Sequence, residues 1–265
     1  MMINPTTKVQ WVVRDDCEML NDLATQVLID VLMNTSRPVI GFATGDTPRK
    51  LYTRLIARSL QDESLQRRWQ DVIGFNLDEY VGLHPNHPQS YHHYMWKHVY
   101  EHLPITKEHI YIPNGIGHLK DNCKEYDDAL QFYGGPDIQI LGIGKNGHIG
   151  FNEPGDHLEI GTHVTRLSET TRQANARFFT DEAVPLQAVT MGIGGILHAK
   201  RILLLAFGSV KRAALLQAFS GSIDTKCPAS FLQLHDRITV FTDQSIDTLD
   251  NGSALLSMIK NPRKL

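Results

Sequence analysis

The sequence lacks several features that would place it in a class at once. No apolar stretch reaches the roughly 18 residues that a membrane-spanning helix needs, and the first residues lack the basic and apolar layout of a secretion signal. We therefore expect a cytoplasmic protein without a membrane partner. The formal net charge is only -3, and no run of lysine and arginine marks a nucleic-acid surface, so nucleic acid is not an expected partner either.

Cysteine is also scarce. Cys17, Cys123 and Cys227 are widely spaced and form no C-x-x-C pair, which indicates neither a disulfide framework nor a cysteine zinc site. We expect three reduced, buried thiols. The 265 residues, of which 42% are hydrophobic, suffice for one large domain over 1–265, and no repeat or linker divides them.

Short apolar segments alternate with amphipathic ones along the chain. This pattern predicts an α/β fold in a single domain: an open, mostly parallel sheet with helices on both faces, Rossmann-like but without a dinucleotide. The expected strands are 9–13, 38–43, 72–77, 110–112, 137–143, 189–191, 202–206 and 238–241. The expected helices are 17–33, 47–57, 91–102, 123–133 and 210–219.

The most informative segment is LGIGKNGHIGFNEPG, residues 141–155, because it follows a buried strand with glycines, a histidine and a carboxylate. His148 and Glu153 should lie just past the carboxyl end of that strand, where open α/β sheets bind ligands. Gly142, Gly144 and Gly147 fit the G-x-G-x-x-G spacing, but the residues after them are poor helix formers. We therefore read the segment as a catalytic loop and expect no dinucleotide cofactor.

Two further segments suit an anion. A turn between the second strand and its helix offers free amides and hydroxyls at a positive helix end, and it lacks the spacing of a Walker loop, which favours a phosphorylated metabolite. Its residues are Thr44, Gly45, Asp46 and Thr47. Arg177 and Lys211 are candidate cations, with Lys211 expected to open a helix after a strand. The alternatives are a plain helix start and solvated surface charges.

Asp78 and Glu79 follow the strand expected at 72–77, on the same rim of the sheet as His148. Adjacent carboxylates usually face opposite directions, so one can enter a site while the other caps or pairs elsewhere. Two solvated loop charges are the alternative interpretation.

Taken together, the motifs FNLDEYVGL (75–83), Ser90-Tyr91, GHIGFNEP (147–154), ANARFF (174–179) and Gly208-Ser-x-Lys211 resemble glucosamine-6-phosphate deaminases over nearly the whole chain. A related family, the 6-phosphogluconolactonases, shares the sheet and the phosphate loop. The resemblance implies an aldose–ketose isomerase and deaminase of amino-sugar catabolism, which converts glucosamine 6-phosphate and water into fructose 6-phosphate and ammonia. It implies no metal and no organic cofactor.

The resemblance also implies roles for single residues. Asp78 matches the base that moves the C2 proton, and His148 matches the residue that assists ring opening, with Glu153 holding its imidazole. The phosphate would rest on residues 44–47, Arg177 and Lys211, with Arg177 in a mobile lid over about 156–185. Glu79 and Tyr91 would support the site.

Four positions depart from the family pattern. Asn146 replaces a common aspartate, and we expect its amide to orient His148 by hydrogen bonding. Asp46 lies in the phosphate loop where glycine or serine is usual; since a carboxylate would repel a dianion, we expect it to point away while its amide binds. His163 and Thr165 fall near the positions of two basic residues that bind an activator in some relatives, so we expect no activation by N-acetylglucosamine 6-phosphate.

Other interpretations stay open. Galactosamine 6-phosphate is an alternative substrate, and a non-catalytic sugar-phosphate sensor is an alternative class, although Asp78, His148 and Glu153 favour an enzyme. A homo-oligomer is possible on this sequence. Five histidines invite a metal site, but they lack the H-E-x-x-H order and we expect none. They are His84, His87, His92, His93 and His98.

Overall fold

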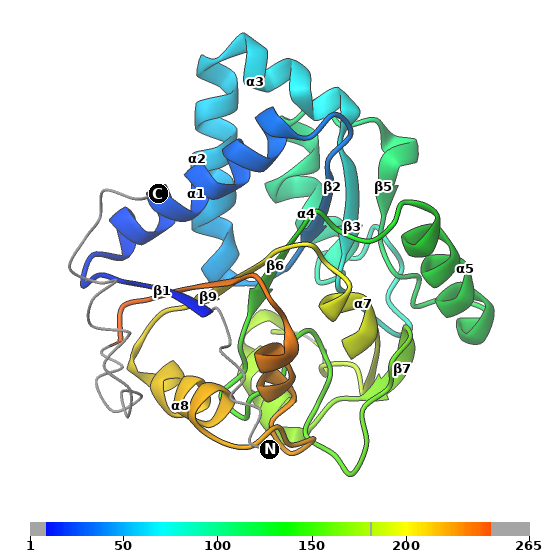
Figure 1. The fold of residues 1–265 in the computed structure, drawn as a ribbon. Coiled ribbons are helices and arrows are strands. Elements are labelled where there is room, and N and C mark those ends of the chain that lie inside the picture. Colours follow the sequence, from blue (N-terminus) through cyan, green and yellow to red (C-terminus); the bar gives the residue numbers. More distant parts are fainter. Residues whose placement is uncertain (1–8, 181, 245–265) are drawn as a thin grey trace.

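The computed structural model describes residues 9–180 and 182–244 and is built around one large parallel sheet (Figure 1). All neighbouring strands in it run parallel. Their order is β1 (Val9–Val13), β10 (Ile238–Thr242), β9 (Ile202–Ala206), β6 (Ile138–Gly142), β2 (Val39–Phe42), β3 (Ile73–Asn76) and β5 (Ile110–Tyr111). The predicted α/β fold class is confirmed.

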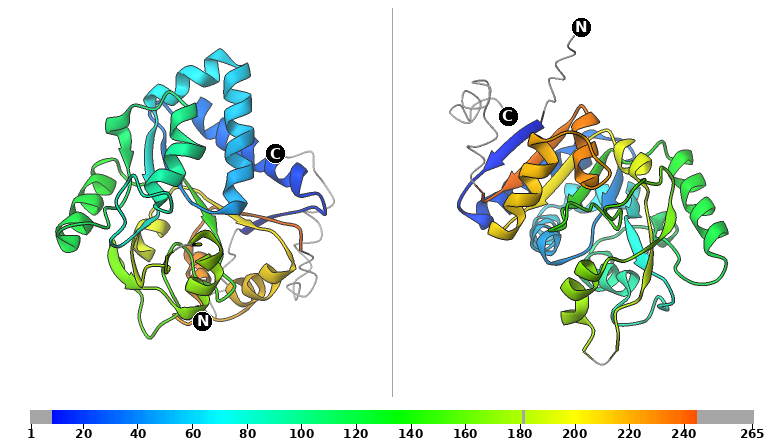
Figure 2. Two further views of the ribbon diagram at one scale, coloured as in Figure 1. Left: turned by 180° about the vertical axis from the view of Figure 1, so that it is seen from behind. Right: turned by 90° about the horizontal axis from the view of Figure 1, so that it is seen from below.

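Helices cover both faces of this sheet. Figure 1 shows α1 and α2 on one side and α8 on the other, and the view from below in Figure 2 agrees. The α-helices are α1 (Cys17–Asn34), α2 (Asp46–Gln61), α3 (Glu63–Arg68), α4 (Tyr91–His98), α5 (Leu119–Phe132), α6 (Glu169–Asn175), α7 (Ile193–Leu197) and α8 (Arg212–Ser220). Short 3₁₀ turns are Trp69–Asp71, Tyr100–His102, Lys107–His109, Ala176–Phe178, Ser209–Lys211 and Pro228–Leu234.

A second, antiparallel sheet stands apart from the first and consists of β4 (Asp78–Tyr80), β8 (Gln187–Thr190) and β7 (His163–Arg166). Leu77 is the point of transfer: its amide donates to Phe42 at 3.1 Å, whereas its carbonyl accepts from Met191 at 2.7 Å. The strand predicted at 189–191 is therefore wrong as a member of the main sheet. Asp78 and Glu79 lie in β4 of the second sheet, not in a loop.

Two apolar clusters follow this division. The first fills both faces of the main sheet, whose central strands β2 and β3 are buried at every position, as near-continuous apolar runs predict. The second is small and joins β4, the segment after Gly150 and residues 167–188. Its members are Tyr80, Phe151, Leu167, Phe179, Val184 and Ala188. The second cluster thus anchors the segment expected to be a lid.

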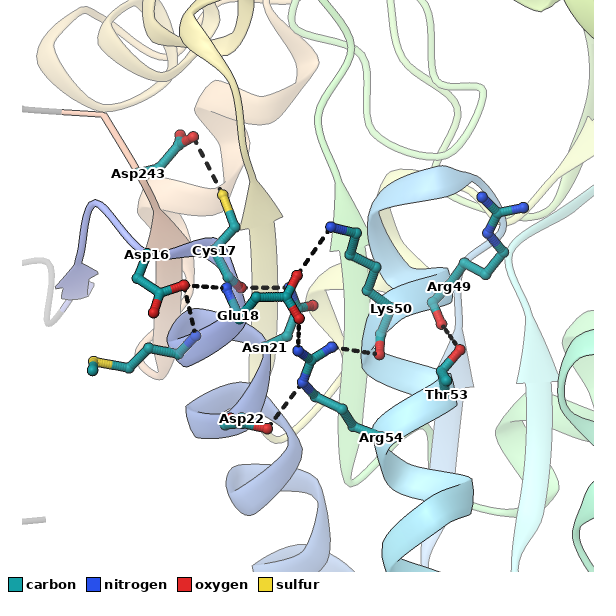
Figure 3. Close-up of polar contacts among 11 residues, drawn as sticks. Asp16, Cys17, Glu18, Asn21, Asp22, Arg49, Lys50, Thr53, Arg54 and Asp243 are labelled. Atoms are coloured by element: carbon teal, nitrogen blue, oxygen red, sulfur yellow. Dashed lines mark hydrogen bonds and ion pairs between the residues drawn. The ribbon is translucent and has the colours of Figure 1, made fainter.

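The helices α1 and α2 are joined by exposed ion pairs (Figure 3). Glu18 of α1 contacts Lys50 and Arg54 of α2, and Asp22 contacts Arg54 at 2.9 Å. Figure 3 also shows that Asp243, just after β10, accepts a hydrogen bond from the thiol of Cys17 at 3.5 Å. Cys123 and Cys227 are buried free thiols as expected, whereas Cys17 is only half-buried.

The order of strands locates the ligand end of the sheet. From β2 the chain proceeds outward through β3 to β5, and then returns to β6 on the opposite side of β2. In open α/β sheets, ligands bind at such a switch point, outside the carboxyl ends of the strands. The loops after β2 and β6 carry Thr44–Thr47 and His148, respectively.

Within the described ranges, no helix is both long enough and apolar enough to cross a membrane.

Candidate active site

Asp78 is the buried carboxyl group of the site. The residue is 5% exposed, and its Oδ1 has no hydrogen-bond partner among the described residues. In β4 it stands opposite Thr190 of β8. Burial raises its pKa from 3.8 to about 8, and the neighbouring charge of Glu79 adds to the rise. A carboxyl group with this pKa can accept and return a proton near neutral pH.

Glu79 faces the other way, as adjacent residues on a strand must. Its carboxylate accepts from the amides of Tyr91 at 2.9 Å and His92 at 2.8 Å, at the start of α4. Burial raises the pKa of Glu79, against the lowering effect of these backbone donors. The prediction that one of the two carboxylates has a capping role is confirmed for Glu79 by this geometry. Glu79 therefore fixes α4 relative to β4.

Tyr91 links the phosphate loop to the second sheet. Its hydroxyl donates to Tyr80 at 3.2 Å and also hydrogen-bonds Thr44. The Tyr80 hydroxyl accepts a second bond from Asn175 of α6 at 3.0 Å. These tyrosines join three segments that are distant in the sequence.

The turn that carries His148 depends on glycine. A Cβ at Gly144 would lie 2.4 Å from Nδ1 of the His148 ring. Gly147 adopts φ +85, and a Cβ there would lie 2.6 Å from the sulfur of Cys227. Gly150, at φ +57, brings the loop beside Asp78: a Cβ there would be 3.8 Å from Asp78 Oδ2. As predicted, no helix begins after the G-x-G-x-x-G spacing; 144–153 is a loop.

Glu153 is the second carboxylate of the site, with a side chain that is 9% exposed. Its Oε2 lies 3.6 Å from Nδ1 of His148 and accepts from Asn146 Nδ2 at 2.8 Å, while Oε1 accepts from the Thr171 hydroxyl. Burial would raise the pKa of Glu153, but His148, Thr171 and Asn146 outweigh it and lower the pKa to about 2. Glu153 therefore stays ionised and orients the imidazole.

Asn146 acts on the histidine less directly than expected. Its Oδ1 accepts from the His148 backbone amide at 3.3 Å, and its Nδ2 binds Glu153, so it positions the turn and the carboxylate. The imidazole of His148 also has a contact from α6: Thr171 Oγ1 lies 3.4 Å from His148 Nδ1.

The loop after β2 forms a helix N-terminus, as predicted. Gly45 precedes α2 with φ +109 and makes no side-chain capping bond, so the first amides of α2 keep their donors available to a ligand. Thr44 and Thr47 are half-buried beside it. The carboxylate of Asp46 has a partner that the sequence did not predict: its Oδ2 pairs with Nη2 of Arg177 at 2.7 Å.

Lys211 ends a 3₁₀ turn after β9 and is the N-cap residue of α8, so it opens a helix after a strand as predicted. Its ammonium donates to the carbonyl of Ile143. Burial lowers the pKa of Lys211, with further lowering from Lys145 and Arg177, so these three cations share one region. The structure thus brings together the loops after β2, β6 and β9 and residue 177.

Several residues of this site were missed by sequence reasoning. Thr171 and Ser168 reach Glu153 from 18 and 15 residues away, and only the serine before α6 gave a local signal as a helix N-cap. Asp243 was also missed. Its carboxylate accepts from the amide of Gly208, at 2.9 and 3.1 Å, and so holds the turn that leads to Lys211.

Among residues 9–180 and 182–244, no group of three or more histidine, cysteine, aspartate or glutamate side chains is placed to hold a metal ion. The histidines after Asp78 have other contacts. His87 pairs with Glu182 at 3.1 Å, and the ring of His92 stacks on Trp96.

The chain matches known proteins over most of its length. The profile of a family described as glucosamine-6-phosphate isomerases/6-phosphogluconolactonase matches residues 15–241. A glucosamine-6-phosphate deaminase of Oceanobacillus iheyensis is 46% identical over 233 residues, which cover 87% of this chain and 92% of the relative. One of Thermoanaerobacter sp. (strain X514) is 44% identical over 234 residues, covering 88% and 91%.

Solved structures point the same way. The structure of a monomeric glucosamine-6-phosphate deaminase superimposes with a TM-score of 0.85 at 42% identity, covering 91% of this chain and 100% of that one. A 6-phosphogluconolactonase from Trypanosoma cruzi shares the fold at 16% identity, with a TM-score of 0.72 over 89% and 95% of the two chains. On this evidence the chain belongs to the family of glucosamine-6-phosphate isomerases and 6-phosphogluconolactonases.

Proposed function

We propose that this protein converts glucosamine 6-phosphate and water into fructose 6-phosphate and ammonia. The observation that carries the proposal is an unpartnered, buried carboxyl oxygen on Asp78, next to a turn that presents a histidine held by a second carboxylate. Relatives named glucosamine-6-phosphate deaminase, 44 and 46% identical over most of this chain, support the substrate.

Asp78 moves the proton between carbon atoms. In the open-chain aldose the hydrogen on C2 is acidic because the aldehyde is its neighbour, and a carboxylate above it can remove the proton and return it to C1. The raised pKa means that the unliganded side chain holds a proton at neutral pH. The ammonium group at C2 of the substrate favours the ionised carboxylate, so substrate binding itself prepares the base.

His148 serves the ring-opening step. Its imidazole can move a proton between the ring oxygen and the C1 hydroxyl, and Glu153 stabilises the protonated ring when it forms. After the proton has passed from C2 to C1, C2 carries the nitrogen as an iminium. Water adds at C2 and ammonia leaves, which gives the ketose phosphate.

The phosphate is bound at the other end of the site. The free amides of α2 and the dipole of that helix favour a dianion at residues 44–47. Lys211 and Arg177 supply positive charge from two further loops. We also propose that residues 156–185, with Arg177 near their end, form a mobile lid.

The proposed location is the cytoplasm. The proposed oligomeric state is a homo-oligomer or, as in the monomeric relative, a single chain.

The test is release of ammonia and fructose 6-phosphate from glucosamine 6-phosphate and, in parallel, from galactosamine 6-phosphate, by the wild type and Asp78→Asn. We expect turnover of the first substrate, and a loss of at least about 10³-fold in kcat in the variant, because the carbon acid then has no base. Turnover of galactosamine 6-phosphate alone would mean that the reaction type is as proposed but that the substrate is the galactosamine ester. Tight binding of either ester without turnover would replace the enzyme with a sensor.

A further inference from the structure

An ion pair joins the two halves of the proposed phosphate site. Nη2 of Arg177 lies 2.7 Å from Oδ2 of Asp46, and Nη2 of Arg49 lies 3.6 Å from the other carboxylate oxygen. Arg177 belongs to the 3₁₀ turn Ala176–Phe178 and is 131 residues from Asp46 in the chain. The contact therefore ties the segment after α6 to the start of α2.

The carboxylate of Asp46 lies where an anion is favoured. Asp46 is the first residue of α2, a helix of 16 residues whose first amides have no side-chain cap. Lys145 and Arg177 both lie close enough to Lys211 to lower the pKa of its ammonium group. Asp46 thus places a negative charge at a helix N-terminus and pairs it with Arg177, which is near a second cation of the proposed phosphate site.

We propose that Asp46 is an internal substitute for the phosphate of the substrate: its carboxylate occupies Arg177 until a phosphate monoester displaces it. The proposal rests on the proposed function for the identity of that ester. A phosphate ester carries about -1.5 to -2 charges at pH 7 and three acceptor oxygens, whereas the carboxylate carries a single charge, so the substrate wins the exchange. An anion with less negative charge does not displace the carboxylate from Arg177. Asp46 therefore sets the minimum negative charge that a ligand needs in order to bind.

The contrasting interpretation is an ordinary surface ion pair. The side chains of Asp46 and Arg177 are 43% and 65% exposed, and exposed pairs contribute little to stability. The two interpretations differ in what phosphate binding does when Asp46 loses its charge. If the pair has no role, loss of the Asp46 charge leaves phosphate affinity unchanged. If Asp46 is an internal substitute, loss of its charge raises phosphate affinity, because the competing carboxylate is gone.

The experiment is calorimetric titration of the wild type and Asp46→Asn with inorganic phosphate, which needs no turnover. We expect the Kd for phosphate to fall about fivefold in Asp46→Asn, the equivalent of about 1 kcal/mol. Glu18→Gln is the matched control, because it removes one carboxylate that pairs with Lys50 and Arg54 on the outer face of the same helix (Figure 3). The control should bind phosphate as the wild type does.

A second background separates displacement from simple repulsion. In Arg177→Gln there is no guanidinium to release, so adding Asp46→Asn should improve phosphate binding by less than twofold. A fivefold gain that persists in this background, an unchanged Kd in Asp46→Asn, or an equal gain in Glu18→Gln would overturn the proposal. Failure of every variant to bind phosphate would overturn it as well. If phosphate binds as expected but no amino-sugar phosphate is turned over, the exchange stands and the proposed function fails.

Discussion

Asp78 and Glu153 are carboxyl groups of one site, both removed from solvent, and their pKa values move in opposite directions. Within the described part of the chain, one oxygen of Asp78 has no hydrogen-bond partner, and the next residue carries a second carboxylate. Glu153 is surrounded by donors on Asn146 and Thr171 and by the ring of His148. Burial works against the charged form in both, so the partners decide which group keeps its proton.

This difference divides the chemistry. A group whose pKa lies near 8 is suited to exchange a proton, and a group whose pKa lies near 2 is suited to remain a fixed negative charge. Both carboxyl groups lie near the loop after β6. Asp78, on β4, lies beside Gly150 and has no donor to its Oδ1 among the described residues, whereas Glu153 accepts from Ser168 and Thr171 at the start of α6. Removing either carboxyl should therefore change different properties.

The largest expected effect is on stability, in Asp78→Asn. Because folding raises the pKa of Asp78, the group contributes most below pH 4 and its contribution is lost as pH rises from about 4 to about 8. At about 1.4 kcal/mol per pKa unit, a rise of the pKa from 3.8 to about 8 means that the neutral amide should make the variant more stable than the wild type by roughly 5 kcal/mol at pH 8. The measurement is the free energy of unfolding in denaturant at pH 5 and pH 8.

The difference in the free energy of unfolding between Asp78→Asn and the wild type should increase from pH 5 to pH 8. Asp71→Asn is a suitable control, since Asp71 pairs with Arg68 at a half-exposed position, and its difference from the wild type should not depend on pH in this way. A difference of the same size at both pH values would mean that burial does not raise the pKa of Asp78.

The second effect is on rate, in Glu153→Gln. The amide keeps the shape and can still accept from Thr171, but it cannot stabilise a protonated His148. We expect kcat to fall about 10²-fold with little change in KM, because the loss concerns proton transfer at ring opening. Steady-state kinetics on glucosamine 6-phosphate, with a pH profile, measure this.

The matched control is Glu159→Gln. Glu159 also faces a histidine, His157, at 3.7 Å, but both side chains are exposed. Its kcat should equal that of the wild type. A similar loss in both variants, or a Glu153→Gln enzyme within twofold of wild type, would contradict the role of Glu153 as the fixed charge.

The two carboxyl groups also show what a sequence can and cannot predict. Glu153 follows His148 by five residues after a buried strand, so their proximity was predictable from a local pattern. Asp78 was placed on the correct rim because β3 is a continuous apolar run, but its strand and sheet were missed. The partner of β4 is β8, more than a hundred residues later, and three-residue strands have no reliable pattern of their own.

The sequence also did not predict the polar contacts between residues that are distant in the chain. The pair of Asp46 with Arg177, and the hydroxyl of Thr171 on Glu153, each join segments whose relative position depends on the packing of the second apolar cluster. Side-chain periodicity describes which face of an element is buried, but not which distant loop comes to cover it. The direction of a pKa shift depends on such contacts and could not be predicted from the sequence.

The smallest expected effect concerns the contact of Asn146 with the carboxylate of Glu153. Asn146 donates to Glu153 Oε2 at 2.8 Å, and Asn146→Asp replaces that donor with a second negative charge. Added negative charge favours the protonated imidazole of His148, so ring opening should survive while the acid limb of the kcat–pH profile moves to higher pH by about half a unit to one unit. Steady-state rates from pH 5.5 to 9 measure the shift. An unchanged profile would mean that residue 146 is screened from the histidine, and that the amide serves only to shape the turn.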